Sequence, residues 1–224
     1  MPRLLPFVLI AGLLVAPSAV RADGDPVALG PPTVFERFVL SACSPCVRET
    51  YPISTLPVAA VPLPAFPRTP TASGSRPGEI VIDVLHAYQL GRSDWRSLAL
   101  RVTMSVSTGS GADLFRLGTG LLDGADVPAL AQAVGEMSRI ASTPRGDLRP
   151  DTVDADYHGG TLRIGVLQIR GESIGYIQTG DLPSMLQRAV WDVPATLYVP
   201  VKDLPAMASA LREAAARIQQ VRGN

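Results

Sequence analysis

Proline is spread so unevenly along this chain that it separates two kinds of structure. Eleven of the 21 prolines lie between residues 26 and 77. Proline lacks an amide hydrogen and clashes with the preceding helical turn, so this stretch cannot form a regular helix, and we expect residues 57–67 to be extended or polyproline-like. The stretch also carries apolar side chains that need cover: Val58, Val61, Leu63 and Phe66. We therefore interpret residues 23–78 as a proline-rich arm lying along the domain or a partner, with residues 68–78 as a connection.

The N-terminus has the three parts of a secretory signal. Arg3 precedes an uncharged stretch of 13 residues, 4–16, and Val20 and Ala22 occupy the positions that a signal peptidase reads. A membrane-spanning helix needs about 20 apolar residues, so this stretch is too short to be one. We predict a signal peptide over residues 1–22 and a periplasmic or secreted protein that has no transmembrane segment.

A lipid anchor is an alternative route of export. Residues 40–43 read Leu-Ser-Ala-Cys, the box that precedes a lipidated cysteine in bacterial lipoproteins. Such a box directly follows the apolar part of the signal, whereas here the charged pair Glu36 and Arg37 stands between them. We interpret the match as chance.

Charge limits the classes of ligand. Loss of residues 1–22 removes Arg3 and Arg21 and leaves 18 basic against 20 acidic residues, a net charge of −2. A chain so close to neutral argues against a protein whose overall charge draws it to nucleic acid or an anionic membrane. Lys202 is the only lysine among the 20 basic residues, and this bias toward arginine indicates a GC-rich bacterial genome.

From residue 79 onward the pattern changes to strands followed by helices. In the first unit, residues 79–140, strands are expected at 79–90, 98–107 and 113–122, and a helix at 126–140. A polar connection, residues 141–156, leads to the second unit, residues 157–224. There we expect strands at 161–170, 174–179 and 195–201, and a helix from Asp203 to about residue 220.

The two expected helices resemble each other. Residues 126–136 and 203–213 align without a gap and are identical at six of eleven positions. This similarity indicates a duplicated strand-strand-strand-helix unit, although two alanine-rich helices could converge by composition. Each helix carries one apolar stripe, which must be buried, and we expect each to pack on its own sheet. The predicted fold class is α+β, with mainly antiparallel sheet covered by helices.

Cys43-Ser-Pro-Cys46 contains both cysteines of the chain. In an exported protein these two thiols can pair, and we predict a structural disulfide. A redox-active site of the thioredoxin type needs a strand before the motif and a long helix after it. Residues 34–40 could form that strand, but the sequence after Cys46 has no room for the helix. The thiol-disulfide enzyme therefore stays as an alternative function.

Asp151, Asp154, Asp156 and His158 form a polar cluster that we expect to lie in a loop. Closely spaced oxygen ligands with a histidine could bind calcium or a transition metal, which would allow a metal-dependent hydrolase. The loop has no acidic residue at its far end, so we interpret these residues as turn residues and expect no metal or other cofactor.

Two glycine motifs resemble catalytic signatures. Residues 171–175 match the Gly-x-Ser-x-Gly elbow of serine hydrolases, but residues 174–179 continue as strand, so we predict a hairpin without a catalytic role for Ser173. Residues 118–124 stand between a strand and a helix, where phosphate can bind, but their spacing fits no phosphate fingerprint and we expect a flexible turn.

No set of polar residues in the sequence specifies a reaction. We therefore expect an exported, non-catalytic bacterial protein that binds another envelope protein or a second copy of itself. No nucleic acid is expected among its partners.

Overall fold

The computed structural model describes residues 33–60, 76–107, 114–142, 152–169, 172–179 and 195–223. The predicted signal peptide, residues 61–75 of the proline-rich arm and Asp151 lie outside these ranges.

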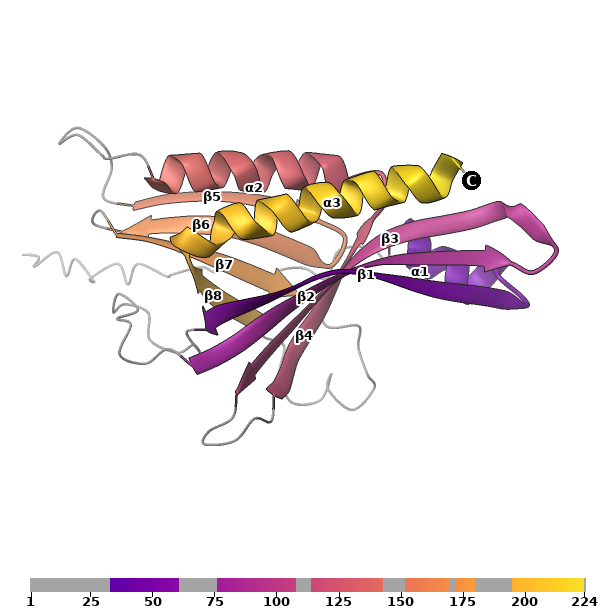
Figure 1. Cartoon of the computed structure of the whole chain (residues 1–224), viewed down its shortest axis with the longest axis horizontal. Helices are drawn as coiled ribbons and strands as arrows, with labels where there is room; N and C mark the ends of the chain where they lie inside the picture. The colour runs from indigo at the N-terminus through magenta and orange to yellow at the C-terminus, as the bar shows by residue number, and fades with distance from the viewer. Residues whose placement is uncertain are drawn as a thin grey trace, which may run out of the picture.

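The described strands form two antiparallel sheets of four strands each, with neighbours in chain order (Figure 1). Sheet 1 contains β1 (Cys46–Ala60), β2 (Arg76–Gln89), β3 (Arg92–Ser107) and β4 (Leu114–Asp123). Sheet 2 contains β5 (Thr152–Gly159), β6 (Leu162–Ile169), β7 (Glu172–Thr179) and β8 (Ala195–Pro200). The helical segments are α1 (Val34–Arg37), the π-helical turn η1 (Phe38–Ala42), α2 (Val127–Ser142), the short turn η3 (Val201–Asp203) and α3 (Leu204–Gly223). The predicted α+β class is confirmed.

Strand β1 corrects the interpretation of the arm. Residues 46–60, which we assigned to it, pair along their whole length with β2. The two prolines that suggested irregular chain, Pro52 and Pro57, lie on an edge strand, where a missing amide hydrogen is tolerated, and Pro52 adjoins a shift in register. Such a strand is hard to recognise from sequence, because alternating apolar and polar residues indicate a strand whereas proline counts against one.

The two long helices exchange sheets. Helix α2 follows sheet 1 in the chain but packs against β5 and β6 of sheet 2, whereas α3 follows sheet 2 and packs against β1 and β2 of sheet 1. The helices also pack on each other, and Figure 1 shows them side by side above the sheets. The expectation that each helix covers its own sheet is therefore wrong. An apolar stripe shows that a helix face is buried but not which surface buries it.

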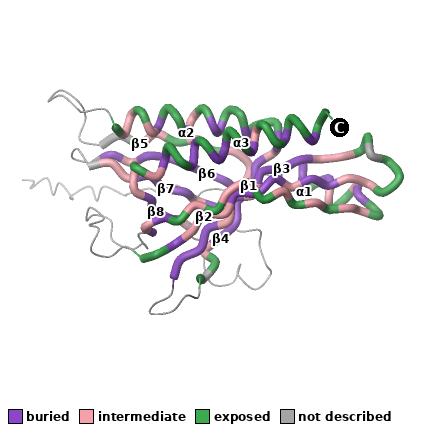
Figure 2. Tube along the Cα trace, viewed as in Figure 1, coloured by how far each residue is buried: buried purple, intermediate pink, exposed green. Residues whose placement is uncertain are grey.

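Both sheets and both helices contribute to one apolar core. The expected stripes are buried in it, from Val127 to Met137 in α2 and from Leu204 to Val221 in α3. Figure 2 shows this burial as alternating bands along both helices. A second, smaller cluster lies on the other side of sheet 1, where Phe35 and Phe38 pack on Ala87 and Ala99.

Gly120 marks one place where the two sheets approach each other closely. It lies within β4, opposite Val102, so residues 118–123 are strand and not the expected flexible turn. A β-carbon at Gly120 would lie 2.9 Å from Leu162 Cδ1 and 3.0 Å from Thr179 Cγ2, both in sheet 2. Glycine within a strand often marks such a close approach, and here it lets β4 pack on β6 and β7.

A long-range cap holds α1 in place. The carboxylate of Asp123, at the end of β4, accepts hydrogen bonds from the backbone N–H groups of Val34 at 2.9 Å and Phe35 at 3.0 Å. Thr33 and Glu36 form a capping box at the same helix end. These contacts hold α1 and η1 against sheet 1. None of the helices described here is long and apolar enough to cross a membrane.

Replacing Gly120 by alanine should destabilise the protein by about 1–3 kcal/mol, because the added methyl group overpacks the contact between the sheets. The control is Gly135→Ala in α2, where a β-carbon would meet no atom within 4 Å. That change should stabilise the protein by about 0.5–1 kcal/mol, since alanine is the better helix former. Urea unfolding followed by circular dichroism measures both effects. Equal stability of Gly120→Ala and wild type would show that the sheets are not in tight contact here.

Candidate functional site

Cys43 and Cys46 form a disulfide that joins η1 to the start of β1. Their loop is tied to the hairpin between β2 and β3, since the backbone N–H of Leu90 donates to the carbonyl of Pro45 at 3.0 Å. The side-chain amide of Gln89 donates to the carbonyl of Ser44, also at 3.0 Å. The bridge therefore belongs to a loop that two hydrogen bonds fasten to the β2–β3 hairpin.

The surroundings of this disulfide differ from those of a thioredoxin-type site. Residues 34–40, the possible preceding strand, are helical, and the segment after Cys46 is strand β1. The positive end of a helix, which stabilises a thiolate in redox-active Cys-x-x-Cys pairs, lies after the motif in such enzymes. Here the motif follows the C-terminal end of η1, so this arrangement gives a Cys43 or Cys46 thiolate no such stabilisation.

The expected polar loop around Asp154, Asp156 and His158 is a strand. All three lie in β5, at alternate positions on one exposed face. The strand was missed because its exposed face is polar, while the residues between, such as Ala155 and Tyr157, lie on the side of sheet 2 that carries the core.

Both carboxylates of β5 are occupied by neighbouring side chains. Arg163 of β6 pairs with Asp156 at 2.7 Å and with Asp154 at 3.6 Å, and the hydroxyl of Tyr176 donates to Asp154 at 2.9 Å. The ring of Tyr176 crosses β6 above Gly165, where a β-carbon would lie 2.7 Å from its Cε1 atom. In the described ranges no group of three or more acidic, histidine or cysteine side chains is placed to hold a metal ion.

Ser173 also lies within a strand. It is the second residue of β7 and its hydroxyl donates to the carbonyl of Ala141 in α2 at 3.4 Å. A nucleophile elbow requires a helix after the serine, so the Gly-x-Ser-x-Gly match has no catalytic geometry.

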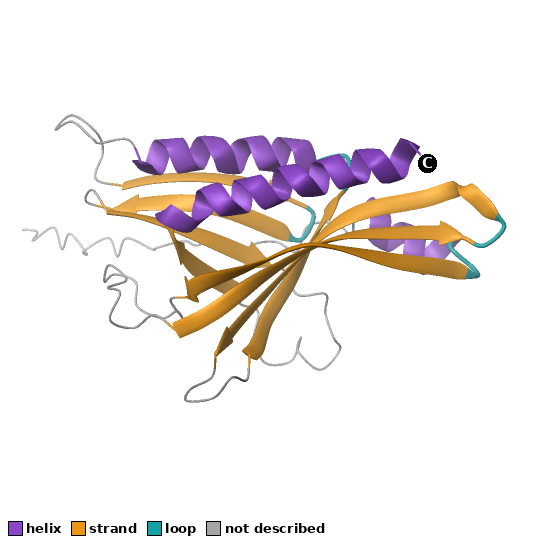
Figure 3. Cartoon of the chain, viewed as in Figure 1, coloured by secondary structure: helices purple, strands orange, loops and turns teal. Residues whose placement is uncertain are grey.

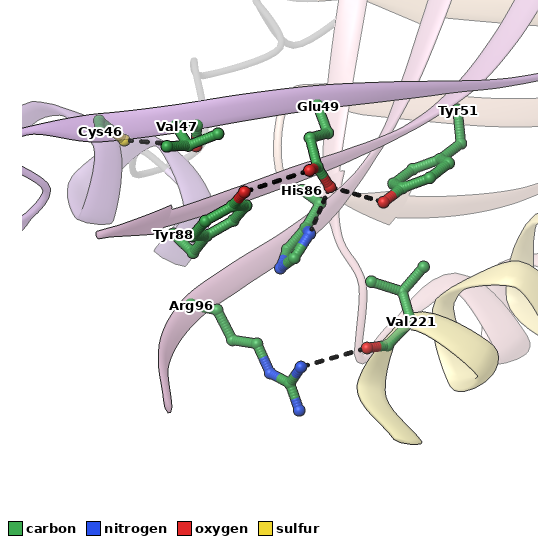
Figure 4. Close-up of polar contacts among 8 residues, drawn as sticks. All are labelled: Cys46, Val47, Glu49, Tyr51, His86, Tyr88, Arg96 and Val221. Carbon is green, nitrogen blue, oxygen red and sulfur yellow. Dashed lines mark hydrogen bonds and ion pairs between the residues drawn. The ribbon is translucent and has the colours of Figure 1, made fainter. Parts of the chain in front are cut away.

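The structure assembles a polar cluster that the sequence did not indicate. Glu49 lies on β1 directly opposite His86 on β2, and Tyr51 and Tyr88 lie two residues further along these strands on the same face. Figure 4 shows all three partners turned toward the Glu49 carboxylate. Oε2 accepts from the Tyr51 hydroxyl at 2.6 Å and from Nδ1 of His86 at 3.1 Å, and Oε1 accepts from the Tyr88 hydroxyl at 3.2 Å.

Three hydrogen-bond donors favour the ionised form of the Glu49 carboxylate. The hydrogen bond from Tyr51, followed by that from His86, lowers the pKa of Glu49 below its ordinary value of 4.5. This ionised carboxylate contributes stability above that value and loses the contribution as the pH falls through the folded-state pKa. Because a carboxylate can only accept, Nδ1 of a neutral His86 carries the proton and Nε2 keeps its lone pair.

Helix α3 lies over this cluster. Arg96 of β3 donates to the carbonyl of Val221 at 3.2 Å (Figure 4). It also donates to the carbonyl of Arg222 at 2.7 Å, and the two bonds cap the C-terminal end of the helix. The Arg217 guanidinium lies 5.8 Å from the centre of the Tyr51 ring. His86 is only 8% exposed, and its Nε2 atom is buried with no hydrogen-bond partner among the described residues. The cluster therefore joins β1, β2 and the end of α3, and it leaves the buried Nε2 atom of His86 without a partner in the described structure.

The other side of this same end of sheet 1 is apolar and exposed. We call the η1–β1 loop, the β2–β3 hairpin and the adjoining η1 the free end of sheet 1; it lies at the right in Figure 3. Leu40 is 81% exposed, Leu90 62% and Trp95 40%. They are three of the five large apolar side chains that stand out as exposed in the described part of the chain.

The sequence predicted neither the Glu49 cluster nor the free end of sheet 1, because both depend on residues 46–60 forming strand β1. The alternation of Glu49 with Tyr51 and of His86 with Tyr88 is visible in the sequence, but only the β1–β2 register brings these pairs together. Similarly, Leu40 and Leu90 are 50 positions apart, and the disulfide-bridged loop joins their segments.

Comparisons with known proteins add no assignment. No family model matches the chain, and no curated protein matches it in sequence.

All five tyrosines of the chain lie in described strands, and each has a pKa raised above 10.0. The cause for Tyr51 is first its hydrogen bond to Glu49, and for the other four it is first burial. Because the folded-state pKa of each tyrosine lies above its unfolded-state value, the neutral phenols stabilise the folded protein fully below about pH 10. Above that pH the phenols ionise more readily in the unfolded chain, so this contribution to the free energy of unfolding is lost. Urea unfolding between pH 8 and pH 11.5 should show a decrease that starts near pH 10.

Glu49→Gln should shift part of the phenolate titration, read as absorbance at 295 nm, to lower pH, because Tyr51 loses its charged acceptor. Glu136→Gln is the control, since this exposed glutamate of α2 pairs with Arg139 and has no tyrosine among its contacts. Identical titrations of Glu49→Gln and wild type would contradict the cluster.

Proposed function

We propose that this chain is an exported bacterial protein that acts without catalysis by binding another envelope component through the free end of sheet 1. The charged, apolar and small-residue parts of residues 1–22 support export. The Cys43–Cys46 disulfide is consistent with an oxidising compartment outside the cytoplasm.

One contrast carries the proposal: large apolar side chains are exposed at the free end of sheet 1, whereas the carboxylates of the polar clusters already have partners within the protein. Leu40, Leu90 and Trp95 are all exposed in the elements that meet at the free end of sheet 1, and exposed apolar side chains gathered at one place mark an interaction site. The carboxylates of Glu49, Asp154 and Asp156 are instead occupied by side chains of the same protein. Binding through the apolar end fits this distribution better than chemistry at a polar cluster.

We also propose that the two strand-helix units arose by duplication. The alignment of residues 126–136 with 203–213 supports this origin, as does the repeated order of four sequential strands followed by a long helix. Exchange of helices between the sheets then gives the two units a common core.

The intact mass of the protein from its native host tests export. We expect a chain that begins at Asp23, with both thiols blocked until reduction and two alkylations afterwards. A chain that begins at Cys43 with acyl groups would replace this proposal by a lipoprotein. A chain that retains residues 1–22 with both thiols reactive would end the proposal of export. If the Cys43–Cys46 disulfide has a reduction potential in the range of thiol-disulfide enzymes, the result would instead favour the thiol-disulfide alternative.

Substitution at the free end tests binding. Leu40→Ser/Leu90→Ser should leave the unfolding curve nearly unchanged, because both side chains are exposed, and should reduce the amount of protein retained by isolated envelopes at least tenfold. Leu114→Ser is the matched control, since this leucine is 44% exposed at the opposite end of sheet 1. Undiminished retention of the double variant would show that the free end is not the binding surface.

A further inference from the structure

The free end of sheet 1 is a narrow tip whose two connections are hydrogen-bonded to each other. It consists of two short connections that lie together at one end of the sheet (Figure 3), joined by the hydrogen bond from Leu90 N–H to the Pro45 carbonyl. The disulfide closes one connection, and Gly91, with a φ of 81°, turns the other. Leu90 therefore stands at the apex of a braced hairpin.

Trp95 lies behind this apex on the side that α1 and η1 cover. Its ring meets the edge of Phe38 at a centroid distance of 6.4 Å, and the Arg92 guanidinium lies 4.4 Å from the Trp95 ring centre. One part of the indole is thus supported by protein, while 40% of the residue remains exposed. An indole held at the edge of an apolar surface beside a cation is typical of side chains at the membrane–water interface.

The charge near the tip differs from that of the whole chain. Arg37, Arg48 and Arg92 are exposed, and within the described ranges none of them forms an ion pair with a carboxylate. Asp94 is the exposed acidic residue on this side of the described structure; the carboxylates of Glu36 and Asp123 are bonded to backbone N–H groups at the start of α1. Exposed arginines therefore outnumber exposed acidic residues on this side, although the mature chain is close to neutral.

We propose that the component bound by the free end of sheet 1 is the surface of an anionic phospholipid bilayer. Leu90, Leu40 and Trp95 enter the headgroup region, and Arg37, Arg48 and Arg92 contact lipid phosphates. This inference rests on the proposed function, because it requires export to a membrane-bounded envelope.

The size and shape of the tip favour lipid over a protein partner. A specific protein interface buries about 800 Å² on each partner and involves roughly 20–30 residues of each. The tip and the adjoining ends of α1 and β1 offer three exposed apolar side chains and three exposed arginines, which is a small area for such an interface. A bilayer accepts a small insertion and adds attraction from its surface charge. The hydrogen bond of Leu90 N–H also limits the polar backbone that would be taken into the headgroup region.

Cosedimentation with lipid vesicles tests the inference. The full mature protein with its disulfide closed should bind vesicles of phosphatidylethanolamine and phosphatidylglycerol in a 3:1 ratio, and bind pure phosphatidylcholine vesicles at least tenfold more weakly. Leu40→Ser/Leu90→Ser should reduce binding to the anionic vesicles at least tenfold. Each of Arg37→Gln, Arg48→Gln and Arg92→Gln should reduce it about fivefold, which corresponds to about 1 kcal/mol per basic residue near an anionic surface.

The controls match these changes at the opposite end of sheet 1. Leu114→Ser removes an exposed leucine there and Arg76→Gln an exposed arginine, and neither should alter binding. Trp191→Phe leaves Trp95 as the only tryptophan, and its fluorescence should then shift to shorter wavelength on addition of anionic vesicles.

Equal binding of the tip variants and the controls to anionic vesicles would overturn the inference. If wild type binds neither kind of vesicle but its retention by envelopes still depends on Leu40 and Leu90, the tip binds a protein. The proposed function then stands and the lipid inference falls. A mass that shows no export would instead remove the proposed function on which this inference rests.

Discussion

The fold depends on the shared core between the two exchanged helices. Helix α2 buries its stripe against sheet 2, and α3 buries its stripe against sheet 1, so neither sheet has a complete core without the other half of the chain. A sheet with one uncovered apolar face is unstable in water, and the exchange covers both faces by mutual packing. The close approach of β4 to sheet 2 at Gly120 belongs to the same contact. The two units should therefore fold as one cooperative body.

The free end of sheet 1 projects beyond this shared core and is supported on both of its faces. Strand β3 is 16 residues long, and β1 and β2 reach the same end of the sheet. On one side of that end α1 and η1 are held by Asp123, and on the other the α3 C-terminus is capped by Arg96. The Glu49 cluster closes the space between the strands and α3. The exposed leucines and Trp95 are thus presented on a braced support, and such rigidity would lower the entropy cost of the binding that we propose.

Local patterns in the sequence predicted the elements whose signals agree with each other. The alternation of Leu98, Leu100 and Val102 predicted β3, and the stripe from Leu204 to Val221 predicted α3. Two strands were missed where signals conflict: prolines mask β1, and aspartates mask β5, whose exposed face needs no apolar residues. The Cys43–Cys46 bridge was predictable because only two cysteines are present. The exchange of helices, the Glu49–His86 pair and the bond between the Cys43–Cys46 loop and the β2–β3 hairpin depend on contacts distant in sequence, which no local periodicity encodes.

The β5 carboxylates show why residue type alone misleads about chemistry. Asp154, Asp156 and His158 are the types of residue that bind metals, and their spacing at every second position places them on one strand face. Arg163 stands on the neighbouring strand opposite this row, and its guanidinium forms ion pairs with both carboxylates. A cation entering there would have to displace these pairs and the Tyr176 hydroxyl. The arginines near the tip differ from Arg163, because Arg37, Arg48 and Arg92 form no ion pair with a carboxylate in the described structure. Where ionic groups are already paired within the protein they stabilise the fold, and where they are unpaired beside exposed apolar side chains they are available to a partner.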